Sequence, residues 1–256
     1  MNWKTFRAML ARDAHVARRN LAVVLVQTML QPLMFVFVFG QVMVRSGMMV
    51  SSYKAILLPG IMGVAMTFSG VQAVAMPLLA EFQFTREIED RLLAPMRMEW
   101  LVAEKILAGM VQALISGAIV VPAAWLLLGR NVGISFERPW LFAAVVLLVA
   151  LFSAAGGLTL GVSMGQTHIG LMFSLVLAPM IFFGCAYYPW SALNSFPILQ
   201  KVVLLNPLVY ANEGLRGTLA PQFPHMPIAV VLGALVVVDT LLVMAGLNRF
   251  AARAIS

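Results

Sequence analysis

The stretch AILLPGIMGVAMTFSGVQAVAMPLLA (residues 55–80), followed directly by EFQFTREIEDRLLAPMRMEW (residues 81–100), decides the fold class of this chain. The first part carries no charged residue and is longer than the ~20 residues with which a helix crosses the hydrocarbon core of a bilayer. The second part holds half of the chain's ten acidic residues. This change from apolar to charged predicts a membrane-spanning helix that ends near residue 81.

The composition of the whole chain supports the same class. Of its 256 residues, 62% are hydrophobic and only 11% are charged, and the mean hydropathy is +0.94. A soluble domain of this length carries roughly 25% charged residues, so we expect an integral membrane protein. The net charge is +7, but the basic residues flank apolar segments and form no stripe with aromatic residues. We therefore expect membrane lipid as their partner and no nucleic acid.

Six apolar blocks divide the chain, and each has about the length of one membrane span. The connections between several of them are too short for a soluble domain, so residues 1–256 are predicted to form a single membrane domain. We expect an all-α membrane protein whose even number of spans places both termini on the same side. The predicted spans are residues 21–44, 55–80, 106–128, 140–164, 169–186 and 228–247.

The lysine and arginine residues orient these spans, because cytoplasmic loops hold the excess of both. With cytoplasmic termini, 11 of the 17 basic residues lie inside and 6 lie outside. We therefore expect both termini in the cytoplasm. The inner set is Lys4, Arg7, Arg12, Arg18, Arg19, Arg86, Arg91, Arg97, Lys105, Arg249 and Arg253, and the outer set is Arg45, Lys54, Arg130, Arg138, Lys201 and Arg216.

Residues 1–20 combine apolar and basic side chains in a helical pattern. Trp3, Phe6 and Leu10 recur at near-helical spacing, with basic residues between and after them. This pattern is typical of an amphipathic helix that lies on an anionic cytoplasmic leaflet. The alternative is a solvated basic tail that only fixes the topology.

The loop at residues 81–98, between the second and third spans, is cytoplasmic in this topology. Phe84, Ile88 and Leu92 lie on one face of a helix, with charges of both signs on the other faces. Pro95 predicts that this helix ends by the preceding residue. The pattern favours a short amphipathic helix that docks on another protein, and the alternative is a solvated connector.

Three groups of residues resemble the ABC-2 type permeases in their order and spacing. The first comprises FTRE (84–87), EDRLLAP (89–95) and EKIL (104–107). The second is LNPLVY (205–210), followed by Glu213, Leu215 and Arg216, and the third is FG (183–184) with YPW (188–190). Together they extend over most of the chain.

The resemblance implies a permease of the bacterial plasma membrane that exports an amphiphilic or hydrophobic substrate, such as a drug, lipid or glycolipid. A separate ATP-binding cassette ATPase would bind ATP and Mg, with no cofactor in this chain. The residues agree, because a P-loop needs Gly directly before its Lys and none of the four lysines follows a Gly. A second permease copy, identical or paralogous, is expected because six apolar helices can hardly enclose a path for an amphiphile.

The resemblance also implies roles for three groups of residues. A coupling helix would dock on the ATPase through Phe84, Arg86, Glu87, Ile88, Asp90 and Arg91. The second and fifth spans would line the substrate path with Met66, Phe68, Gln72, Met172, Phe173, Val176 and Met180. A lid over the exit would contain Tyr188, Asn206, Pro207, Tyr210, Glu213 and Arg216.

Residues 187–225 are rich in Pro and Gly, yet residues 193–210 are markedly apolar for an exposed loop. A re-entrant helical hairpin in the outer leaflet fits both features, since irregular backbone at membrane depth needs a covering of protein or water. Glu213 and Arg216, at i and i+3, are placed to pair within it. The alternative is an ordinary outer loop with Trp190 and Tyr210 at the interface.

Asp239 lies near the middle of the last span, where a charged residue costs ~2.5–3.5 kcal/mol on insertion scales. Proton transfer is one possible role, but a hydrogen bond to a neighbouring helix fits equally well, and we expect the structural role. The single cysteine, Cys185, excludes an internal disulfide.

Two other functions compete with the permease. Gly161, Ser163 and Gly165 match the G-x-S-x-G pattern of serine hydrolases, with His168 close by, but that pattern requires a strand-to-helix turn. An ion-coupled secondary transporter is the other alternative, although such folds contain internal repeats and no repeat is evident here.

Overall fold

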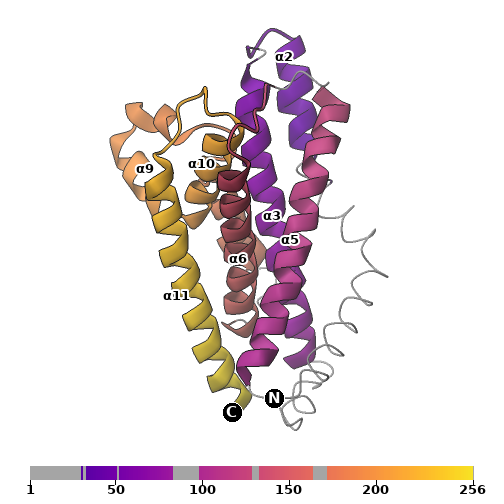
Figure 1. Cartoon of the computed structure of the whole chain (residues 1–256), viewed down its shortest axis with the longest axis vertical. Coiled ribbons are helices and arrows are strands. Elements are labelled where there is room, and N and C mark those ends of the chain that lie inside the picture. Colours follow the sequence, from indigo (N-terminus) through magenta and orange to yellow (C-terminus); the bar gives the residue numbers. More distant parts are fainter. Residues whose placement is uncertain are drawn as a thin grey trace.

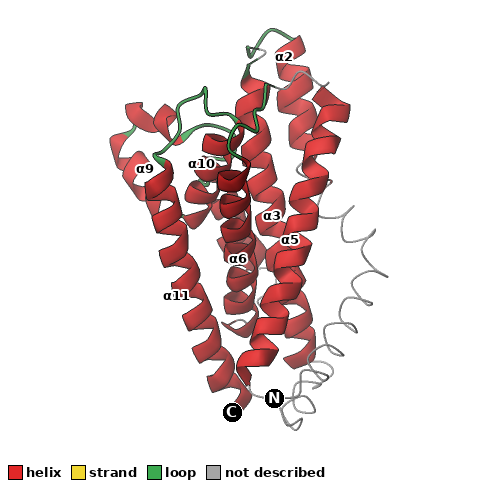
Figure 2. Cartoon of the chain, viewed as in Figure 1, coloured by secondary structure: helices red, strands yellow, loops and turns green. Residues whose placement is uncertain are grey.

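The computed structural model describes residues 30, 33–50, 52–82, 98–128, 133–163 and 172–255. Within these ranges the secondary structure is helical, with no strand (Figure 2). Most of the connecting loops lie together at one end of the bundle (Figure 2). This confirms the predicted all-α class.

Among the described residues, four helices are long and apolar enough to cross a membrane. They correspond to the second, third, fourth and sixth predicted spans. The largest differences are at the ends that are predicted to be cytoplasmic, where the third span begins at Met98 and the sixth continues to Ile255. These helices are α3 (Tyr53–Ala80), α5 (Met98–Leu128), α6 (Pro139–Ser163) and α11 (Ile228–Ile255).

The first and fifth predicted spans are described only in part. Leu33–Arg45 is a shorter apolar helix that includes the π-helix η1 (Val38–Val42) and α2 (Met43–Arg45). The fifth block contains η4 (Met172–Leu177), another π-helix, and α8 (Ala178–Phe182). The helix of the fifth block ends at Phe182, and residues 183–186 form a turn. Residues 21–29, 31–32 and 169–171 of the two blocks lie outside the described ranges, as do the predicted interface helix at 1–20 and residues 83–97 of the loop at 81–98. The count of six spans therefore stays a prediction.

The segment between the last two predicted spans folds into a series of short helices. A proline begins both of its α-helices, which suits the first helical turn because the N–H that proline lacks has no partner there. Asn206 caps the longer one by accepting a hydrogen bond from the backbone N–H of Leu208 at 3.0 Å. The elements are η5 (Trp190–Ser195), α9 (Pro197–Val202), η6 (Val203–Leu205) and α10 (Pro207–Leu219).

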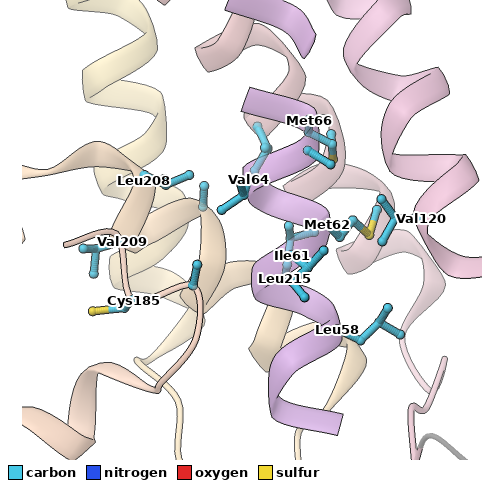
Figure 3. Close-up of a cluster of buried hydrophobic side chains, with 14 of the residues drawn as sticks. Leu58, Ile61, Met62, Val64, Met66, Val120, Cys185, Leu208, Val209 and Leu215 are labelled. Atoms are coloured by element: carbon cyan, nitrogen blue, oxygen red, sulfur yellow. The ribbon is translucent and has the colours of Figure 1, made fainter. Parts of the chain in front are cut away.

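Helix α3 lies at the centre of the bundle and packs against α5, α6 and α10 (Figure 1). Its close contacts depend on small residues, which let helices approach in a membrane. A Cβ at Gly157 of α6 would lie 2.7 Å from the carbonyl oxygen of Val71. Figure 3 shows one part of the resulting core, in which Met62 of α3 points toward Val120 of α5 and Leu215 of α10 belongs to the same cluster.

Helix α6 separates α3 from α11 over most of their length (Figure 1). Much of α11 faces outward, and its exposed residues include Val237, Leu241 and Met244. An apolar outward face is expected for a helix that contacts lipid. The side chains of α11 that are buried, such as Leu235 and Phe250, are therefore those that hold it to the bundle.

Candidate functional site

An apolar cavity of about 190 Å³ lies between the helix at residues 33–45, α3 and the fifth predicted span. Three of its aromatic rings belong to residues far apart in the chain, Phe35, Phe68 and Tyr187. The rings of Phe35 and Tyr187 pack with centroids 4.9 Å apart, and Phe39 lies 5.8 Å from Tyr187. The wall consists of Phe35, Phe68, Leu177, Ala178, Ile181, Phe182 and Tyr187.

Four predicted path residues with described side chains lie on or next to this wall. Phe68 is part of it, and Gln72 follows one turn later on the same face of α3. Val176 and Met180 are each adjacent in sequence to a wall residue, and all four side chains are half-buried. Met180 and Phe68 pack against one apolar cluster, so the structure brings the second and fifth spans together here.

Met66 lies elsewhere. Its side chain is fully buried, and a Cβ at Gly117 of α5 would lie 2.8 Å from its Cγ and Sδ atoms. Met66 therefore packs between α3 and α5 and does not reach the cavity. Met172 and Phe173 are in η4, and their side chains lie outside what the structure describes.

Within the segment 187–225, the predicted pair of Glu213 and Arg216 forms a fully buried ion pair. The Glu213 carboxylate also accepts hydrogen bonds from the backbone N–H groups of Trp190, at 2.9 Å, and Met226, at 2.8 Å. Burial lowers the pKa of the Arg216 guanidinium from its usual value, and the Glu213 carboxylate opposes that shift. Glu213 thus joins α10 to the segments that precede and follow it.

Three polar side chains of this region bind carbonyl groups around the end of α8. Arg216 Nη2 donates to the carbonyl of Cys185 at 2.9 Å. Asn212 Nδ2 donates to Gly184 and Asn206 Nδ2 donates to Met180, each at 2.7 Å. Because the last carbonyls of a helix have no partner within it, α10 supplies the cap of the fifth predicted span.

The remaining predicted lid residues make local contacts. Tyr210 Oη donates to the carbonyl of Leu204 at 2.9 Å, and Tyr188 Oη donates to that of Phe182 at 3.3 Å. Pro207 is the first residue of α10. Asn212 was missed from the sequence, although it precedes Glu213 and lies one turn before Arg216 on the same helix face.

At the end that is predicted to be cytoplasmic, a buried ion pair joins the two sides of the predicted coupling loop. Lys105 Nζ lies 2.7 Å from Glu81 Oε1, and both side chains are at most one-tenth exposed. Glu81 follows α3, and Lys105 belongs to α5. The proposed docking residues themselves, Phe84, Arg86, Glu87, Ile88, Asp90 and Arg91, lie outside the described ranges.

Asp239 is 3% exposed, and neither of its carboxylate oxygens has a hydrogen-bond partner among the described residues. The predicted hydrogen bond to a facing helix is therefore not among the contacts that the structure describes. A buried carboxyl group without a partner lowers stability.

The serine-hydrolase pattern lies in a different setting from the one that its chemistry needs. Ser163 is the last residue of α6, and its hydroxyl donates to the carbonyl of Thr159 in the preceding turn. A nucleophilic serine requires a strand-to-helix turn, and no strand occurs in the part of the chain that the structure describes. Gly165 and His168 lie outside that part.

These features define a class of protein. The long helices are apolar, the cavity is lined by apolar and aromatic groups, and several of the buried polar side chains form ion pairs or bind backbone groups at helix ends. Such a chain is a multi-pass membrane protein.

The chain belongs to the ABC-2 type transporter family, whose model matches residues 4–220. This confirms the predicted family and makes the chain a membrane permease subunit. Membership indicates a transport subunit rather than an enzyme, and it implies an ATP-binding cassette partner in general.

Curated relatives agree with the family. The chain is similar to the inner membrane transport permease YadH of Escherichia coli K12, with 27% identity over 240 residues, which cover 92% of this chain and 90% of that protein. The YadH proteins of Escherichia coli O157:H7 and Shigella flexneri match with the same identity and coverage.

Proposed function

We propose that this chain is the membrane subunit of an ATP-driven exporter of amphiphilic or hydrophobic substrates. A separate ATPase subunit binds ATP and Mg, and two permease copies, identical or paralogous, surround the substrate path. The names of the relatives support a bacterial inner membrane location, and the excess of basic residues on one side supports cytoplasmic termini.

The aromatic cavity is the observation that supports an amphiphilic or hydrophobic substrate. The side chains of its wall carry no charge, so a charged group placed there would lose its hydration without a compensating partner. Aromatic rings provide large apolar surfaces for an acyl chain or a ring system. The volume of about 190 Å³ is smaller than the ~300–1,000 Å³ of a pocket for a whole drug-sized ligand. One copy therefore holds only part of a substrate, and a second copy completes the site.

The short helices before α10 support a position at the outer membrane surface. Phe196, Ile198, Val202 and Leu205 are all more than half exposed, although none belongs to a predicted span. An apolar face of this kind is compatible with the outer leaflet. Helix α10 is buried, and its side chains bind carbonyl groups at the end of the fifth predicted span. This arrangement is compatible with a lid segment over the exit.

The contacts at the cytoplasmic end support the coupling role of the loop at 81–98. The Glu81–Lys105 pair holds the two sides of the loop together. A force applied by an ATPase to the predicted amphipathic helix at 82–94 therefore reaches α3 and α5 together. Since α3 carries Phe68, this movement changes the cavity.

A transport assay tests the proposal. In inside-out vesicles that contain the permease and its ATPase, nitrobenzoxadiazole-labelled phosphatidylethanolamine or a hydrophobic cationic dye is supplied from the outside, which is the cytoplasmic face, and its inward movement is followed after addition of ATP. We expect Phe68→Ala to reduce ATP-dependent movement of at least one probe, while Leu126→Ala, which changes a residue of α5 that is 86% exposed, does not. Equal rates in the two variants for every transported probe contradict the cavity as the substrate path.

A further inference from the structure

The last turns of α11 contact the cytoplasmic ends of two other long helices. Arg253 Nη1 lies 2.8 Å from the carbonyl oxygen of Val162 and 3.4 Å from that of Gly161. Arg249 Nη1 donates to the hydroxyl of Ser163. These are the last three residues of α6, where helix carbonyls lack partners and carry partial negative charge. Arg253 therefore caps α6, and Arg249 binds the side chain of its last residue.

The same part of α11 holds Phe82, the last described residue before the coupling loop. The rings of Phe250 and Phe82 meet edge to face, with centroids 5.6 Å apart. The Phe82 ring also contacts Arg253, whose guanidinium carbon lies 4.7 Å from the ring centroid. This distance is suited to a cation–π interaction. Phe250 is fully buried, so this contact is part of the packed core.

Arg253 thus touches the chain just after α3 and the end of α6 at once. Over the rest of its length α11 is separated from α3 by α6 (Figure 1). The contact with Phe82 is therefore a place where a displacement of the coupling loop can reach α11 directly, beside the packing of Phe250 against the start of α5.

The other end of α11 is tied to the outer polar network. Helix α11 begins at Ile228, two residues after Met226, whose backbone N–H donates to Glu213 at 2.8 Å. A continuous helix transmits axial movement better than a loop because its backbone hydrogen bonds keep its length fixed. One rigid element therefore joins Phe82 at the cytoplasmic side to the buried ion pair of α10.

We propose that Arg253 and Phe250 are positioning residues that transmit movement of the coupling loop through α11 to the outer segment around α10. This inference rests on the proposed ATP-driven function and adds a second route to the one through α3 and α5. It assigns a function to the cytoplasmic extension of α11, which lies beyond the region matched by the family model.

A simpler role for Arg253 is that of a topological charge on the cytoplasmic side. The two roles differ in their tolerance of lysine. Lysine keeps the charge, but it lacks the planar guanidinium that stacks on an aromatic ring while it donates to two carbonyl oxygens. Arg253→Lys therefore preserves a topological role and breaks the transmission contact.

The test measures the response to ATP at two reporter cysteines in the complex of permease and ATPase in nanodiscs. Glu99→Cys reports on the exposed first turn of α5, and Gln222→Cys reports on the exposed segment between α10 and α11. Labelling rates with a fluorescent maleimide are compared with and without ATP and vanadate. The native Cys185 is fully buried, and its labelling in the parent chain is subtracted as background.

When the chain carries a reporter cysteine and no other substitution, we expect ATP to change the labelling rate at residue 99 and at residue 222. Arg253→Lys and Phe82→Leu should each keep the response at residue 99 and lose the response at residue 222. Arg138→Lys is the matched control, because Arg138 is exposed and directly precedes α6, at the opposite end of that helix from Arg253. This variant should keep both responses.

Three results contradict the inference, and they are distinguishable. An unchanged response at residue 222 in Arg253→Lys shows that α11 does not need this contact to move. Loss of both responses in that variant, with the control intact, shows that Arg253 only stabilises the complex. If neither cysteine responds to ATP in the parent complex, the ATP-driven function itself fails.

Discussion

Replacement of Glu213 by glutamine tests the buried network that holds α10. Glutamine has the same shape but no charge, so it leaves the buried guanidinium of Arg216 without its counter-ion. It also replaces one carboxylate oxygen by an NH₂ group, which then faces a backbone N–H, because Trp190 and Met226 donate to different oxygens of Glu213. Neither Glu213 nor Arg216 is exposed to solvent that could compensate.

The expected loss is large for one substitution. Removal of one partner from a buried ion pair costs about 3–5 kcal/mol, and a buried N–H without an acceptor costs about 1–3 kcal/mol. Because the glutamine oxygen keeps part of the network, we expect a loss of about 3–5 kcal/mol in the free energy of unfolding.

The assay is equilibrium unfolding in mixed micelles with increasing sodium dodecyl sulfate, followed by helix content and by tryptophan fluorescence. Glu137→Gln is the matched control, because Glu137 is exposed and its carboxylate bonds only the hydroxyl of Ser135 among the contacts described, at 3.0 Å. That variant should change the free energy of unfolding by less than about 0.5 kcal/mol. A loss below about 1 kcal/mol for Glu213→Gln would refute the reasoning, because the pair would then contribute no more than a surface contact.

Three further predictions concern the loop, the topology and the last span. Glu87→Arg should abolish ATP-dependent transport in a folded, membrane-inserted protein, because it reverses a charge on the docking helix; normal transport in vesicles would contradict the coupling role. Cysteines at positions 46 and 222 should react with an impermeant maleimide that is added to intact cells. A cysteine at position 85 should react only after permeabilisation, and the opposite pattern would overturn the orientation. Asp239→Leu should raise the free energy of unfolding by about 1–3 kcal/mol, because it removes a buried carboxyl group without a described partner; a loss in the same unfolding assay would instead show that the group has one.

The long helices could be predicted from the sequence because apolar length is a local property. The ends of these helices that are predicted to be cytoplasmic could not. Helix α5 begins at Met98 and not at residue 106, because Leu101 and Val102 are buried in a cluster that also contains Phe250. That cluster joins residues far apart in the chain, and no local pattern of residues 98–105 specifies it.

The outer network was predicted only within one helix. The i, i+3 spacing indicated the pair of Glu213 and Arg216, and the structure confirms that contact. The backbone groups that complete it belong to Trp190, Cys185 and Met226. Those partners depend on how the segment folds back, which the spacing of two side chains does not determine.

Only part of the cavity wall was predicted from the sequence. Phe68 was predicted and lies on the wall, whereas Phe35, Phe182 and Tyr187 were not predicted. Met66 and Phe68 are two positions apart and therefore point to nearly opposite sides of a helix with 3.6 residues per turn. Helical geometry separates such residues into two sets, but only tertiary packing shows which set faces the cavity.

The energy source of transport tests the central claim most directly. Purified permease is reconstituted into liposomes with and without its ATPase subunit, and movement of the labelled lipid or the dye is measured with ATP inside or outside and with ionophores that remove all ion gradients. The account predicts movement that requires both ATP and the ATPase subunit and that persists with ionophores present. Movement driven by an ion gradient in the absence of the ATPase subunit would contradict it and would indicate a secondary transporter.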